Sequence, residues 1–153
     1  MPNYKGHLVG GFATYIVLLF LLRSTNPSLI TAAQWLVICL LGALFPDVDT
    51  KSKIQKIFYT GFVILLFFLI SLNKLKLAVF LSVISLSPLV VNHRGIFHKA
   101  WFIILITVAF VIFTVEIKLF HSCSEITIPA LFFTAGALSH IILDMGIKQL
   151  FKL

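Results

Sequence analysis

The chain has few charged side chains and very few acidic ones. Only 11% of its 153 residues are charged, and five are Asp or Glu. An ordinary soluble domain contains about 25% charged residues, and a soluble chain this short must cover most of its surface with polar groups. The composition therefore excludes a soluble single domain. The high apolar content excludes a disordered chain as well.

The scarcity of cysteine and the absence of two motifs narrow the chemistry that the chain could perform. The chain has two cysteines, Cys39 in an apolar run and Cys123 in a polar connection. They give neither a disulfide framework nor a thiolate metal site. The sequence has no H-E-x-x-H element, which excludes the usual pattern of intramembrane zinc proteases. It also has no G-x-S-x-G element, the usual nucleophile motif of serine hydrolases.

Apolar residues are abundant: they make up 60% of the chain, and the mean hydropathy is +1.11. Because about 20 apolar residues cross a bilayer as a helix, the sequence predicts an all-α integral membrane bundle of about six short transmembrane helices. These helices would form one transmembrane domain over residues 1–153. Only Asn73 and Lys74 separate the third and fourth spans, which predicts a tight helical hairpin. The expected spans lie near residues 8–22, 30–45, 57–72, 75–91, 100–120 and 127–145.

The basic residues indicate an orientation in the membrane rather than a nucleic-acid partner. The formal net charge is +7, but the Lys and Arg side chains stand between apolar runs. With six spans, eight of the 12 basic residues lie on the side that holds both termini, and four lie on the other. Since positive charge accumulates in cytoplasmic connections, both termini are expected in the cytoplasm. The lipid bilayer is the expected partner.

Histidine and acidic residues gather at one face of the predicted bundle. Four of the five histidines and three of the five acidic residues fall on the side that holds both termini. Ionisable groups at membrane depth are costly and are usually paired or functional. The clustering therefore predicts a metal site. The candidate ligands are His7, Asp47, Asp49, His93, His98, His140 and Asp144.

The spacing of these residues agrees with a shared site. His140 and Asp144 are four residues apart, so on a helix they project from one face. His93 and His98 flank Gly95, which permits a turn that brings both imidazoles together. Imidazole with carboxylate suits zinc, with manganese or iron as alternatives, rather than calcium. Seven groups exceed the needs of one tetrahedral ion, so one or two divalent ions are expected.

Each of these signals also has a purely structural interpretation. A single His near a membrane interface is more often a helix-end residue than a ligand. The Asp47 and Asp49 pair could cap the next helix, and Arg94 could simply follow the positive-inside rule. The His140–Asp144 pair could be a structural hydrogen bond. The metal-site interpretation is favoured because independent residues of this kind would not converge on one face.

Small residues predict where the helices approach one another closely, because they let two backbones come together. These small residues are Gly10, Gly11, Gly42, Gly136 and Ala137.

A metal site would also require a particular arrangement of the spans. If the site exists, the last span must lie beside the segment that carries His98 and beside the turn that carries Asp47.

The order of the motifs resembles a known family. A His near the start is followed by F-P-D-V-D, then H-R-G-I-F-H, then S-H-I-I-L-D. This order resembles the YdjM-like family, which includes an inner-membrane protein described as LexA-regulated. The family is described as membrane-bound, metal-dependent hydrolases, largely on its His and Asp pattern. The resemblance covers His7 to Asp144, except that Phe97 and Lys99 replace a usual Thr and Ser.

The leading hypothesis is a metal-dependent hydrolase of an ester or phosphoester in a lipid or lipid-linked substrate, in a bacterial or archaeal cytoplasmic membrane. A metal there would lower the pKa of bound water to about 7 and supply hydroxide. Arg94 could clamp a phosphate bidentately, and Asp49 or Asp144 could orient or deprotonate the water. The alternatives are a metal-ion transporter or sensor, and a structural membrane protein with a vestigial metal site.

Overall fold

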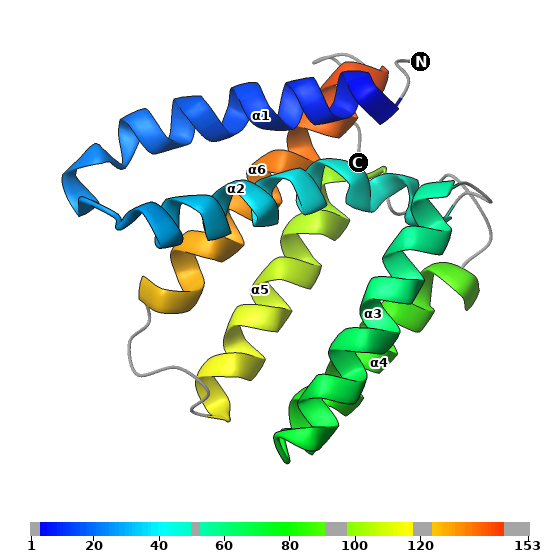
Figure 1. The fold of residues 1–153 in the computed structure, drawn as a ribbon. Helices are drawn as coiled ribbons and strands as arrows, with labels where there is room; N and C mark the ends of the chain where they lie inside the picture. The colour runs from blue at the N-terminus through cyan, green and yellow to red at the C-terminus, as the bar shows by residue number, and fades with distance from the viewer. Residues whose placement is uncertain (1–3, 50–52, 91–97, 118–123, 146–153) are drawn as a thin grey trace. The chain divides into compact units, whose positions relative to one another are not determined.

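The computed structural model describes residues 4–49, 53–90, 98–117 and 124–145. In these ranges the chain is all-α, as predicted, with six α-helices at the predicted spans (Figure 1). Two short 3₁₀ helices, η1 and η2, flank α2. The elements are α1 (Tyr4–Leu21), η1 (Arg23–Thr25), α2 (Leu29–Leu44), η2 (Phe45–Asp49), α3 (Lys53–Ser71), α4 (Leu75–Val90), α5 (Ala100–Glu116) and α6 (Ser124–Met145).

Among the residues that the structure describes, three segments are long and apolar enough to cross a membrane. They are Tyr4–Leu21, Leu29–Val48 and Ser124–Asp144, of 18, 20 and 21 residues. At 1.5 Å per residue, about 20 residues cover the roughly 30 Å hydrocarbon core. Two shorter apolar helical segments, Phe58–Ser71 and Ala100–Glu116, accompany them. The prediction of an all-α membrane protein is therefore confirmed.

Polar residues between the helices set where each helix begins and ends. Ser28 caps α2, because its side chain accepts a hydrogen bond from the Thr31 amide at 3.2 Å. Asn73 adopts a left-handed conformation with φ of 56° and separates α3 from α4. The Lys74 amide donates back to the Leu69 carbonyl at 2.9 Å. This closes the tight α3–α4 hairpin that the sequence predicted.

The chain divides into two compact units, residues 1–46 with 98–153, and residues 47–97. The second unit contains the α3–α4 hairpin, in which the Tyr59 hydroxyl donates to the Ser85 carbonyl at 2.9 Å. The boundary falls inside η2, directly after Pro46. The single transmembrane domain over residues 1–153 stays a prediction.

The first unit is organised around the contact between α2 and α6. The helix α1 packs against both of them, and α5 packs against α6. In Figure 1, α1 and α2 run antiparallel. A cluster of buried side chains fills the space between the helices, with the rings of Trp35 and Phe132 stacked at 5.2 Å. Tyr15 and Cys39 complete this cluster.

Two glycines allow α2 and α6 to touch backbone to backbone. A Cβ atom on Gly42 would collide with the Phe133 carbonyl, and one on Gly136 would collide with the Cys39 carbonyl. A backbone group cannot move aside as a flexible side chain can. The predicted role of these two small residues in close helix approach is therefore confirmed. This contact between α2 and α6 also brings His140 of α6 to the end of α2, where it meets Ala43.

Candidate metal centre

Three histidines and one aspartate of the first unit are buried together at the ends of its helices. His7 lies near the start of α1, and His98 immediately precedes α5. His140 and Asp144 lie in the last part of α6. His7, His98 and His140 are 2%, 8% and 0% exposed, and the Asp144 side chain is 4% exposed. Burial of four ionisable groups is costly unless they are paired or hold an ion.

The carboxylate of Asp144 is the common neighbour of the three imidazoles. Its Oδ1 lies 3.3 Å from His7 Nε2. Its Oδ2 lies 3.3 Å from His140 Nε2 and 3.8 Å from His98 Nε2. The helical spacing of four residues explains how His140 and Asp144 reach the same place. Each of the three histidines therefore turns its Nε2 edge toward a single carboxylate.

The tautomer of His140 follows from a hydrogen bond to α2. Its Nδ1 lies 2.7 Å from the Ala43 carbonyl oxygen. Because a carbonyl oxygen only accepts, Nδ1 carries the proton and donates it. In the neutral ring Nε2 then has a free lone pair, and this atom faces Asp144. Metal-binding histidines are commonly oriented by such a bond from their other ring nitrogen to a carbonyl.

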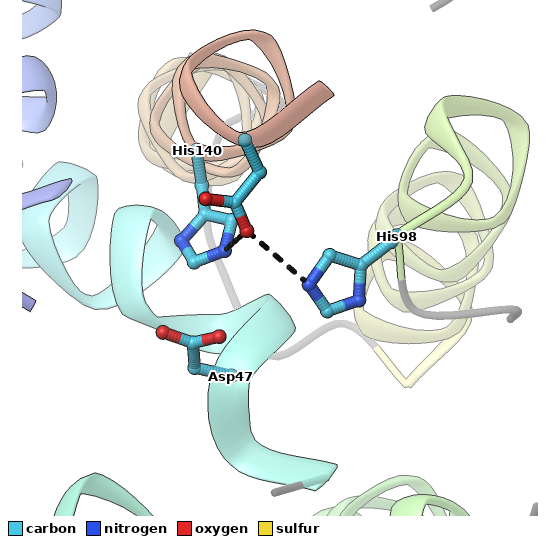
Figure 2. Close-up of side chains that lie close together, drawn as sticks. Asp47, His98 and His140 are labelled. Atoms are coloured by element: carbon cyan, nitrogen blue, oxygen red, sulfur yellow. Dashed lines mark ion pairs between the residues drawn. The ribbon is translucent and has the colours of Figure 1, made fainter. Parts of the chain in front are cut away.

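Four residues meet the distance requirement for a shared ion. Asp47, His98, His140 and Asp144 each offer one ligand atom, and these atoms all lie within 4.8 Å of one another. Figure 2 draws the imidazoles of His98 and His140, which reach this place from the residues just before α5 and from α6. Asp47 is the residue after Pro46 in η2, the turn that continues from α2. This buried group could hold a metal ion.

The donor atoms fit a transition metal better than calcium. Two imidazoles with two carboxylates match the preferences of zinc, manganese and iron. Nδ1 of His98 and Oδ1 of Asp144 are buried and have no hydrogen-bond partner within the described part of the chain. Buried polar atoms of this kind call for an ion, a ligand or water. The donor set and the buried position therefore agree with a site that could hold a metal ion.

The relative tilt of the rings separates two kinds of histidine pair. The rings of His98 and His140 are inclined at 66° with centroids 5.5 Å apart. The rings of His7 and His140 are nearly parallel, at 17°, and stack at 3.7 Å. A bound ion lies in the plane of each imidazole that ligates it, on the nitrogen lone pair. Inclined rings can meet this condition together, whereas stacked rings cannot.

The remaining predicted site residues are not placed. His93 and Arg94 lie outside the described residues. Asp49 ends η2, and its side chain lies outside the described part of the structure. Asp47, His98, His140 and Asp144 are brought together, and His7 contacts Asp144. The expectation that the last span lies beside the segment carrying His98 agrees with the His98–Asp144 contact.

The sequence interpretation missed one participant, the backbone carbonyl of Ala43. A carbonyl group leaves no trace in a pattern of side chains, so no motif could have identified it. An indirect signal was present in the adjacent Gly42, because a close helix crossing exposes neighbouring backbone groups to the facing helix. The close approach of α2 and α6 explains why this carbonyl reaches His140.

The fold and the site together define a helical membrane protein with a buried His and Asp cluster that could hold a metal ion. The profile of the YdjM inner membrane protein family matches residues 1–151. The chain therefore belongs to this family and is an inner-membrane protein. This confirms the family resemblance and the membrane localisation predicted from the sequence. Neither a curated protein nor a solved structure matches the chain.

Proposed function

We propose that the protein is a metal-dependent hydrolase that cleaves an ester or phosphoester bond of a lipid or lipid-linked substrate. The observation that carries this proposal is the buried group of Asp47, His98, His140 and Asp144, with the His140 ring held by the Ala43 carbonyl. Such oriented imidazoles with carboxylates are common ligands in metal-assisted hydrolysis. Membership of an inner-membrane family supports a substrate that resides in the bilayer.

Zinc is the ion proposed for the site, with manganese or iron as alternatives. When bound, a divalent ion would polarise the scissile ester and lower the pKa of its water to about 7. Asp47, His98, His140 and Asp144 are the proposed ligands. Burial of the site is favourable for this chemistry, because charge interactions strengthen when water is excluded.

Residues predicted from the sequence are proposed to bind the substrate phosphate and to activate the attacking water. The guanidinium of Arg94 is proposed to bind the phosphate of the substrate through two parallel hydrogen bonds. Asp49 is proposed to orient and deprotonate the attacking water, with Asp144 as the second candidate for this role. Both Asp49 and Arg94 belong to segments adjoining ligands of the proposed site, since they are close in sequence to Asp47 and His98.

The lipid nature of the substrate is supported by the surface of the helices. Large apolar side chains are exposed along α1, including Phe12 at 50% and Phe20 at 64%. Similar side chains on α5, such as Ile112 at 58%, are exposed as well. These surfaces suit acyl chains, while His7 and His98 mark the helix ends where the polar headgroup would lie.

The test uses purified full-length protein in nanodiscs that contain phosphatidylglycerol and phosphatidylethanolamine. Phospholipid turnover is measured with added zinc or manganese, after chelation, and after metal is restored. We expect turnover that chelation abolishes and the ion restores, and that His98→Ala removes. Full activity in metal-free protein, or no turnover with either ion, contradicts the proposal. Uptake of metal into proteoliposomes without turnover would favour transport instead.

A further inference from the structure

We propose that His7 is a positioning residue for Asp144 and not a ligand of the metal ion. In this arrangement His7 donates its Nε2 proton to Asp144 Oδ1, so that Oδ2 is directed to the ion. The inference rests on the metal site of the proposed function, but it does not depend on the reaction or the substrate. The residues whose contacts carry it, which are His7, Ala43, His98, His140 and Asp144, belong to the first compact unit.

The two oxygens of Asp144 face different partners. Oδ1 lies 3.3 Å from His7 Nε2, whereas Oδ2 lies 3.3 Å from His140 Nε2 and 3.8 Å from His98 Nε2. Oδ1 has no hydrogen-bond partner among the residues that the structure describes. The 3.3 Å between His7 Nε2 and Oδ1 is an ion-pair distance rather than a formed hydrogen bond. In the proposed arrangement, binding of the ion at Oδ2 lets an Nε2 proton of His7 complete a hydrogen bond to Oδ1. With Oδ1 held in this way, the carboxylate is left with one oxygen for the ion.

Ring geometry excludes a shared ion for His7 and His140. The two rings are stacked with centroids 3.7 Å apart and an angle of only 17° between their planes. An ion ligated by both nitrogens would have to lie in both ring planes, at about 2.0–2.1 Å from each nitrogen. Two nearly parallel planes at stacking distance meet only far outside that range. One of the two histidines must therefore act in another way.

The surroundings of the two rings indicate which histidine is the ligand. The Nδ1–H of His140 donates to Ala43, which leaves Nε2 as a lone pair, and His140 belongs to the group of four with a common ligand position. His7 does not belong to that group. The ion would lie between the His140 Nε2 lone pair and Asp144 Oδ2. Without a second ion, a lone pair on His7 Nε2 would face Oδ1 acceptor to acceptor, which is repulsive. The tautomer with the proton on Nε2 removes this repulsion.

The alternative is a second ion, bound by His7 Nε2 and bridged to the first ion by Asp144. This arrangement would also be compatible with the 3.3 Å distance between His7 Nε2 and Asp144 Oδ1. It predicts two ions per chain. The positioning role predicts one ion, and it predicts that a side chain with a similarly placed N–H can replace the imidazole. Metal stoichiometry and ligand type therefore separate the two arrangements.

The experiment measures Co²⁺ binding to the full-length protein in detergent by elemental analysis, titration and visible absorption. The variants are His7→Gln, which keeps an N–H donor, His7→Ala, which removes it, and His140→Ala, which removes a ligand. We expect one Co²⁺ in the wild type. His7→Ala should bind about 10- to 100-fold more weakly with the same absorption bands. His7→Gln should recover most of this affinity, and His140→Ala should lose the ion.

Circular dichroism and gel filtration establish that each variant is folded. Two ions in the wild type with one in His7→Ala overturn the inference while leaving a metal site intact. Shifted or weakened absorption bands in His7→Gln, which indicate loss of a nitrogen ligand, overturn it as well. Failure of the wild type to bind any Co²⁺ overturns both this inference and the metal-dependent function. Normal metal binding without lipid turnover contradicts only the proposed reaction.

Discussion

His140 on α6 donates its Nδ1 proton to the carbonyl oxygen of Ala43 at the end of α2, over 2.7 Å. On α6, Gly136, His140 and Asp144 follow one another at intervals of four residues, so they lie along one helix face. Gly136 packs on the backbone of α2, and the next residues of the same face reach the candidate metal centre. The contact between α2 and α6 therefore both packs the first unit and sets the positions of His140 and Asp144 in the candidate metal centre.

The first prediction concerns the two contact glycines. Gly42→Ala and Gly136→Ala each place a methyl group against a backbone carbonyl of the facing helix. We expect each substitution to lower the free energy of unfolding by about 1–3 kcal/mol or more, because overpacking displaces the backbone. We also expect weaker metal binding, since the displacement separates Ala43 from His140. Thermal unfolding in detergent and Co²⁺ titration measure the two effects.

Gly61→Ala on α3 is the matched control for the glycine variants. A Cβ atom at Gly61 meets nothing within 4 Å, and alanine is the better helix former. We expect unchanged or slightly increased stability and full metal binding. Wild-type stability in Gly42→Ala and Gly136→Ala would show that the two helices do not approach as closely as described.

The second prediction concerns the proposed ligands. His98→Ala and His140→Ala should reduce bound zinc well below one ion per chain, with an affinity loss beyond the 10- to 100-fold typical of outer-shell partners. Added zinc should raise the unfolding temperature of the wild type, because an ion that binds only the folded state stabilises it by mass action. It should not stabilise either variant. Elemental analysis and thermal unfolding provide the measurements.

Ser139→Ala provides the control on the same helix. The Ser139 hydroxyl donates to the Gly136 carbonyl and takes no part in the group of four. We expect this variant to retain zinc and the thermal response. If His140→Ala also retained both, the cluster would be a structural hydrogen-bond network rather than a metal site.

Much of the fold could be predicted from the sequence because its signals are local. Long apolar runs predict membrane helices from composition alone, and Asn73 with Lys74 marks the α3–α4 hairpin. The grouping of His140 with Asp144 follows from helical spacing, and these residues do lie 3.3 Å apart. The predicted six-span order places His7 and His98 on the same side as Asp144, and both histidines do contact Asp144.

The orientation of the site residues could not be predicted in the same way. The stacking of His7 on His140 depends on how three helices pack, and ring planes leave no periodic pattern in the sequence. The division of the Asp144 oxygens between His7 and the other histidines has the same origin. Sequence identified candidate ligands, but only the packed structure separates those that can share one ion from those that cannot.

The third prediction tests Arg94 as a phosphate-binding residue. Arg94→Ala should lower kcat/KM for a phosphoester lipid by about 10- to 100-fold, equivalent to loss of roughly 1.5–3 kcal/mol of charge-assisted hydrogen bonding. Arg94→Lys should recover little, because an ammonium group lacks the planar fork of a guanidinium. The metal content should not change in either variant. Turnover assays and elemental analysis of the same samples measure both properties.

Arg23→Ala is the control for the loss of one arginine. Arg23 lies in η1, with its guanidinium 5.1 Å from the Phe20 ring centroid, at the other end of α1 from His7. Its loss should leave turnover unchanged. An equal decrease in Arg23→Ala and Arg94→Ala would attribute the effect to net charge near the membrane rather than to phosphate binding.

The last prediction concerns orientation in the inner membrane. The excess of basic residues on the side of the termini predicts that this side is cytoplasmic. Ser24 in η1 and Lys99 before α5 are both exposed and lie toward opposite sides of the predicted bundle. In a Cys123→Ser background, Ser24→Cys should react with a membrane-impermeant maleimide in intact cells. Lys99→Cys should react only after the cells are permeabilised.

The labelling pattern also decides from which compartment the metal centre is reached. Lys99 follows His98 directly, so labelling of Lys99→Cys only after permeabilisation would place the ligand end of α5 on the cytoplasmic side. The remaining cysteine, Cys39, is fully buried between helices and contributes little background. The reverse pattern would place the termini and the His and Asp cluster on the outer side. The proposed substrate would then be a lipid of the outer leaflet, because the cluster lies at the helix ends rather than at mid-span.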